Sequence, residues 1–143
     1  MAKAKLVRRE DWLQRLEVYL AETGREPFVW GQHDCMLDVS AMIGAMTGTD
    51  PAKAYRGKYT DRKSGLALAR ALGIKDHIEG LSQGLAQIPT GFADVGDLVE
   101  LPGHTAGIVQ GRYIWAMHEQ GRALVDFGEA KRAWRIPLKG ETQ

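Results

Sequence analysis

The sequence predicts an α+β domain, with N-terminal helices packed on a small C-terminal antiparallel β-sheet or barrel. Two observations carry this prediction. Apolar residues recur at helical spacing in the first half of the chain, and after residue 96 short β-rich runs alternate with glycine turns. The 143 residues fit a single domain, which we expect to span residues 1–143 with its core at about 9–138.

The helices are expected in the first 85 residues. Trp12, Leu16 and Tyr19 fall on one face of the first helix, and Asp34 can cap the N-terminus of the second. A proline after a capping residue favours another helix start. The expected helical segments are residues 9–22, residues 35–46, a short stretch beginning at Asp50-Pro51, residues 64–72 and a turn near 78–85.

The strands are expected after Gly96-Asp97. Pro102-Gly103, Gly111-Arg112 and Gln120-Gly121 are turn signals between short apolar runs, which favours an antiparallel meander or a small closed barrel. The expected strands cover residues 98–101, 105–110, 113–117, 123–127 and 134–138.

The composition narrows the classes of function. Hydrophobic residues make up 44% and charged residues 26%, which predicts a folded core. The 19 basic and 18 acidic side chains nearly balance, so we expect no nucleic-acid partner. Cys35 is the one cysteine, which excludes an intramolecular disulfide, and the scattered histidines lack metal-ligand spacing. We therefore expect neither a metal nor a cofactor.

The N-terminal residues 1–10 are basic and lack the apolar segment of a secretory signal. No apolar run approaches the roughly 18–20 residues that span a bilayer. We expect a protein that is made in the cytoplasm and has no membrane segment.

Cys35 is the candidate for chemistry. It follows the capping residue Asp34, so it is expected in the first turn of a helix, where the partial positive charge and free N–H groups stabilise a thiolate. A thiolate at this place is a candidate nucleophile. The alternative is a small buried side chain that packs beneath the helix.

The order of several motifs resembles the NlpC/P60 cysteine peptidases. Phe28-Val-Trp30-Gly31 precedes Asp34-Cys35, and Gly96-Asp97 precedes the strand that carries Gly107-Ile108. More closely, the chain is similar to a short phage-borne branch of that family without an assigned function. Such a resemblance implies a papain-like fold with the nucleophile at Cys35. The motifs that carry the resemblance to this branch are Phe28 to Cys35, Thr47-Gly-Thr-Asp50, Tyr55-Arg-Gly-Lys-Tyr59 and Ala133-Trp-Arg135.

The chain departs from the peptidase pattern at the base. Peptidases of the family place a histidine where this sequence has Thr105, and threonine cannot take up a proton near neutral pH. His104 is one residue earlier, and a one-residue offset on a strand directs a side chain to the opposite face. A β-bulge would restore the direction, so His104 remains a candidate base.

Three other histidines are considered. His33 lies two residues before Cys35 and is a candidate neighbour of the thiol or a residue that holds the loop. His118 follows a predicted strand, near the position where the family places a residue that orients its base. His77 lies in an irregular connection and is expected to be exposed.

Three functions stay open. The resemblance implies a virion component of a phage tail tip or baseplate hub, made in the host bacterial cytoplasm, with other tail-tip proteins as partners and peptidase activity lost or weak. The alternatives are an active cysteine peptidase that cuts peptidoglycan stem peptides during entry, and a transient tail-assembly factor. A basic set near Tyr55 and Tyr59 is either a solvated face or a partner-binding patch; its members are Arg56, Lys58, Arg62 and Lys63.

Overall fold

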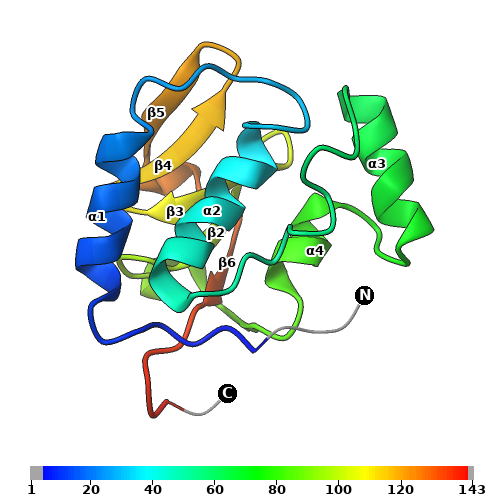
Figure 1. Cartoon of the computed structure of the whole chain (residues 1–143). Helices are drawn as coiled ribbons and strands as arrows, with labels where there is room; N and C mark the ends of the chain where they lie inside the picture. Colours follow the sequence, from blue (N-terminus) through cyan, green and yellow to red (C-terminus); the bar gives the residue numbers. More distant parts are fainter. Residues whose placement is uncertain (1–4, 142–143) are drawn as a thin grey trace.

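The structure, a computed structural model, describes residues 5–141 and has the α+β class that the sequence predicts (Figure 1). The prediction about a secretory signal concerned residues 1–10, of which residues 1–4 lie outside the described range. Each predicted helix except the one at Asp50-Pro51 has a counterpart. The helices are α1 (Trp12–Glu22), α2 (Cys35–Thr47), α3 (Arg62–Ala71) and α4 (His77–Ser82).

Within residues 5–141 the sheet has six antiparallel strands in the order β1-β6-β2-β3-β4-β5. Strands β2 to β5 form the predicted meander, whereas β6 returns to lie between β1 and β2. The two edge strands β1 and β5 do not pair, so within the described residues the sheet is open and is not a closed barrel. The strands are β1 (Ala86–Ile88), β2 (Leu98–Leu101), β3 (Thr105–Val109), β4 (Tyr113–His118), β5 (Gly121–Asp126) and β6 (Arg132–Arg135).

The helix predicted at Asp50-Pro51 is wrong, because residues 51–57 form successive turns. The Asp50 carboxylate does accept a hydrogen bond from the N–H of Ala52, as a cap would. It is also bonded to Ser40 on α2 and to Arg56, at 2.6 Å from the Arg56 Nε. These bonds fold the segment back onto α2, so tertiary contacts override the local preference.

Helix α2 is the centre of the core. It packs beside α1 and against β3 and β4 of the sheet, while α3 and α4 stand to one side (Figure 1). Leu37, Val39, Met42, Ile43 and Met46 are fully buried. A second, smaller cluster of buried apolar side chains comes from the strands of the sheet and includes Val99, Ile114 and Ala116.

No helix among the described residues combines the length and the apolar character that a membrane crossing requires. The N-terminal segment is held against the rest of the fold by its backbone. The N–H of Arg8 donates to the carbonyl of Pro137 and that of Arg9 donates to the carbonyl of Met46, both at 2.9 Å. These bonds place the segment beside the end of α2 and the residues after β6.

Candidate functional site

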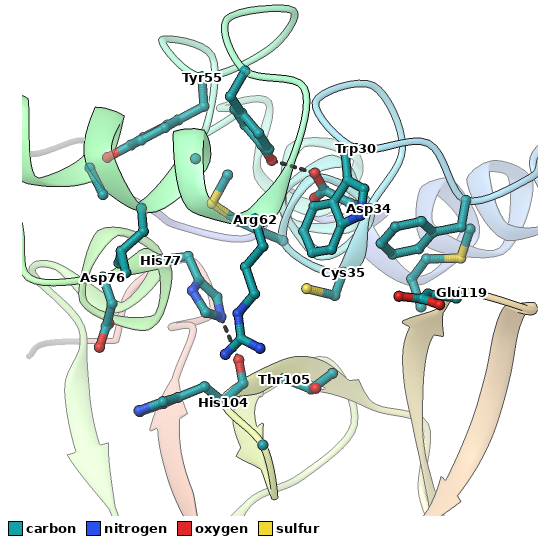
Figure 2. A pocket seen from close by; sticks show the side chains of 18 of the residues that line it. Trp30, Asp34, Cys35, Tyr55, Arg62, Asp76, His77, His104, Thr105 and Glu119 are labelled. Atoms are coloured by element: carbon teal, nitrogen blue, oxygen red, sulfur yellow. Dashed lines mark hydrogen bonds between the residues drawn. The ribbon is translucent and has the colours of Figure 1, made fainter.

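A cavity of about 520 Å³ opens at the N-terminus of α2. Its walls come from the loop before α2, from α3, from the start of α4, and from the ends of β3 and β4 (Figure 2). The size is in the range of about 300–1,000 Å³ typical of ligand pockets. The lining residues with aromatic, charged or potentially reactive side chains include Phe28, Trp30, Cys35, Arg62, Arg70, Lys75, His77, His104, Thr105, His118 and Glu119.

Cys35 is the first residue of α2, and its half-buried side chain lines the cavity. Asp34 caps the helix in an extended conformation and accepts from the N–H of Leu37 at 3.0 Å. Its other carboxylate oxygen accepts from the N–H of Gly31 at 2.9 Å and from the hydroxyl of Tyr59. Asp34 is therefore a buried carboxylate with its hydrogen-bonding capacity used by the fold.

The surroundings of Cys35 favour the neutral thiol over the thiolate. Burial and the negative charge of the adjacent Asp34 raise the pKa of Cys35 from 9.0 to about 11. The N–H groups of the helix start and the more distant guanidinium of Arg62 act in the opposite direction and are outweighed. A pKa of about 11 leaves on the order of one thiol in 10⁴ ionised at pH 7. A thiol with a raised pKa is a weaker nucleophile at neutral pH than an ordinary cysteine thiol.

Thr105 lies across the cavity from Cys35 at the start of β3 (Figure 2). The β2–β3 ladder runs without a bulge from Leu98↔Ile108 to Leu101↔Thr105, so the register is the regular one. His104 precedes the strand in the turn, with φ 60°. Its ring Nδ1 lies 2.6 Å from Glu100 Oε2, and Figure 2 shows the side chain directed away from Cys35.

Two further histidines line the cavity. The ring of His77, at the start of α4, is hydrogen-bonded through Nε2 to the backbone carbonyl of His104. His118 is the last residue of β4 and is half-buried. Among residues 5–141, no imidazole nitrogen forms a hydrogen bond with the Sγ of Cys35.

His33 lies outside the cavity lining. It is buried, with Nδ1 3.4 Å from Glu26 and Nε2 3.7 Å from Asp38 on α2. Asp38 is itself paired with Arg122 on β5, at 2.6 Å. His33 therefore belongs to a polar network that fastens the loop before α2 to the helical layer.

The aromatic motif before α2 forms one wall of the cavity. Phe28 and Trp30 meet edge to face, with ring centroids 5.0 Å apart. Gly31 is required by its surroundings: its φ is +79°, and an added Cβ would lie 1.9 Å from the carbonyl oxygen of Tyr59. The loop and the Tyr59 segment are consequently in backbone contact, which fixes the position of the aromatic wall.

The remaining motif residues support the fold. Buried Asp97 accepts from Arg8 at 2.7 Å and from the N–H of Ile136 at 3.1 Å, which ties both ends of the domain to β2. Gly96, at φ +87°, lets Arg8 approach closely. An added Cβ on Gly107 would lie 2.4 Å from Ile114, so that glycine permits close strand packing.

Sequence reasoning missed the contribution of Arg62 and Tyr59. Arg62 begins α3, and Figure 2 shows its guanidinium extending into the cavity between Cys35 and the His77–His104 contact. In the sequence, both residues stand out only as members of a basic and aromatic cluster. The bond from Tyr59 to Asp34 spans 25 positions in sequence, and no local pattern encodes it.

No group of three or more His, Cys, Asp or Glu side chains within residues 5–141 is arranged to hold a metal ion. Comparison with known proteins identifies a family for the chain, and that family has no assigned activity. No curated protein and no solved structure gives a significant match to the chain. A family model matches residues 7–136, almost the whole chain, and the chain belongs to that family, which is described as a domain of unknown function (DUF6950).

Proposed function

We propose that this protein is a non-catalytic relative of the NlpC/P60 peptidases that serves as a component of a bacteriophage tail tip or baseplate hub. The observation that carries the non-catalytic part is the state of Cys35. Its pKa is raised to about 11, and its thiol forms no hydrogen bond with an imidazole within the described residues. A cysteine peptidase requires a thiolate and a proton donor for the leaving amine.

Three features support the loss of a base rather than its displacement. Thr105 occupies the place that faces the thiol, the β2–β3 ladder has no bulge, and His104 is paired with Glu100. Loss of general acid–base catalysis alone lowers a rate by roughly 10²- to 10⁴-fold. Without peptidase activity, the fold can still present its shape and its cleft to a partner.

The tail assignment rests on the sequence. The motifs from Phe28 to Cys35 and from Ala133 to Arg135 resemble a branch borne among phage tail genes. The open cavity, with its aromatic wall and several cations, is consistent with a protein that binds a partner. A resemblance of this kind supports a role by analogy.

The experiment is the protein composition of purified, washed virions of a phage that encodes this chain, measured by quantitative mass spectrometry. The proposal predicts this chain at a fixed ratio to a tail-tube protein. Its presence in infected cells together with its absence from virions would instead identify an assembly factor that leaves before maturation.

A second arm tests the non-catalytic part. Purified protein and a Cys35→Ala variant are incubated with peptidoglycan, and released peptides are quantified. We expect equal, background release from both. Release that depends on Cys35 would identify an active peptidase and overturn this part of the proposal, whatever the virion composition.

A further inference from the structure

One side of the cavity carries cations that the described part of the fold leaves unpaired. Arg62 and Arg70 come from the two ends of α3, and Lys75 follows in the connection to α4. None of the three forms an ion pair with a carboxylate within residues 5–141. By contrast, each of three other arginines is paired with an acidic side chain at 2.6–2.7 Å; these are Arg8, Arg122 and Arg132.

Within the described residues, none of the acidic side chains that line the cavity forms an ion pair with these three cations. Asp34 accepts three hydrogen bonds from the protein. Asp76 caps α4 by accepting from the N–H of Glu79 at 3.0 Å. Glu119 follows β4, and Figure 2 places it on the side of the cavity away from Asp76 and His77. Among the described residues, Arg62, Arg70 and Lys75 thus line the cavity without an ion pair, while Asp34 and Asp76 line it as hydrogen-bonded caps.

The opposite wall is apolar. Phe28 and Trp30 form an edge-to-face pair, and Met36 of α2 also lines the cavity. A guanidinium near aromatic rings is well suited to a ligand that carries a carboxylate next to an apolar group, because Arg binds carboxylates through two parallel N–H donors.

We propose that the cavity binds an extended segment of a partner protein through a carboxylate held by Arg62 and an adjacent apolar side chain packed on Phe28 and Trp30. Arg70 and Lys75 add positive potential along the path of the segment. This inference rests on the proposed function in treating the cleft as a binding site. The carboxylate comes either from the C-terminus of the partner or from an Asp or Glu side chain, and the probes below distinguish these sources.

The experiment is a titration of ¹⁵N-labelled protein followed by NMR with three blocked dipeptides. The probes are N-acetyl-leucyl-leucine with a free carboxylate, its C-terminal amide, and N-acetyl-leucyl-aspartic acid amide. The free acid, the aspartyl amide or both are expected to shift resonances of residues that line the cavity, and to bind at least tenfold more tightly than the leucyl amide. Binding of the free acid alone indicates a C-terminus, and binding of the aspartyl amide indicates an internal acidic residue.

Arg62→Gln and Lys63→Gln form a matched pair of variants. Both remove one positive charge from the first turn of α3, but Lys63 does not line the cavity. We expect Arg62→Gln to weaken binding of the carboxylate probe at least tenfold and Lys63→Gln to change it less than threefold. The spectra of the free variants check that each remains folded.

The proposal is overturned by equal binding of acid and amide, by equal effects of the two variants, or by no shifts from any probe at a concentration of several millimolar. These outcomes are independent of virion composition and of peptide release, so they leave the proposed function standing. Conversely, an active peptidase that still binds the carboxylate through Arg62 would contradict only the proposed function.

Discussion

The hydroxyl of Tyr59 donates a buried hydrogen bond to the carboxylate of Asp34, the residue that caps α2 and precedes Cys35. This contact joins the segment before α3 to the loop before α2, which are two walls of the same cavity. After burial, the negative charge of Asp34 is the next cause of the raised pKa of Cys35. Asp34 therefore contributes both to the geometry of the cavity and to the raised pKa of the thiol.

We expect Tyr59→Phe to destabilise the protein by about 1–3 kcal/mol, because it removes a buried hydrogen bond to a charged group. Urea unfolding monitored by circular dichroism gives the change. Tyr113→Phe is the matched control, since the Tyr113 side chain is exposed and its hydroxyl makes no hydrogen bond in the described structure. Equal stabilities of the two variants would show that the Tyr59–Asp34 bond does not support the fold.

Gly31→Ala tests the backbone contact between the aromatic loop and Tyr59. Gly31 and Gly73 have similar φ values of +79° and +82°, but only at Gly31 would an added Cβ clash, 1.9 Å from the carbonyl oxygen of Tyr59. Gly73→Ala is therefore expected to cost only the conformational penalty of about 1–2 kcal/mol. Gly31→Ala should cost more by at least about 2 kcal/mol, as expected for overpacking of a rigid contact. Comparable losses of stability in Gly31→Ala and Gly73→Ala, measured by thermal or urea unfolding, would contradict the close approach of Gly31 to Tyr59.

Glu100 is expected to make stability depend on pH. Burial alone would raise its pKa, but the hydrogen bond and charge of Arg132, with His104, lower the pKa of Glu100 below 4.5. A lowered pKa stabilises the fold above the unfolded value of about 4.5, and that stability is lost as pH falls through the folded value. Glu100→Gln should therefore be less stable than wild type at pH 7, with the difference narrowing toward pH 3.

Urea midpoints measured between pH 3 and pH 7 check this prediction. Glu17→Gln is the control, because Glu17 is an exposed residue of α1 without an ion pair in the described structure. The lowered pKa of Glu100 would be contradicted if the stability difference between Glu100→Gln and wild type stayed constant over this pH range or widened on acidification.

Thr105→His tests whether an imidazole opposite Cys35 lowers the pKa of the thiol. An imidazole placed opposite Cys35 is expected to favour the thiolate, because a nearby opposite charge lowers a thiol pKa by about 1–3 units. Alkylation of Cys35 by iodoacetamide at pH 7 should then become at least tenfold faster. Thr105→Asn supplies a polar side chain that cannot be protonated, and it should leave the rate within about twofold of wild type. Equal rates for the two variants would place Thr105 away from the thiol.

Much of the fold follows from local sequence. Asp34 before an apolar run specified the start of α2, and the turns at Pro102-Gly103 and Gly111-Arg112 specified the hairpins that join β2, β3 and β4. The three-residue strand β1 was missed because it is short, and its antiparallel pairing with β6 joins distant parts of the sequence. The start of β6 at Arg132, earlier than predicted, is likewise set by pairing with β1 and β2.

The site was less accessible to sequence reasoning. The position of Cys35 at a helix start followed from its neighbours, whereas the sign of its pKa shift did not. The position at a helix start favours a lowered pKa for the thiol, but burial and the charge of Asp34 raise the pKa of Cys35. Burial of the thiol depends on tertiary packing, and the cavity that Cys35 lines also takes residues from α3 and the start of β3, which are far from Cys35 in the chain.

The pH profile of Cys35 alkylation tests the central claim most directly, and because the protein has one cysteine the signal belongs to a single residue. The rate of reaction with iodoacetamide, followed by intact mass from pH 5 to pH 11.5, should rise as one sigmoid with an apparent pKa near 11. A reactive plateau at neutral pH, or an apparent pKa at or below the ordinary value of 9.0, would contradict the account. Either result would mean that the thiol is activated in the native protein.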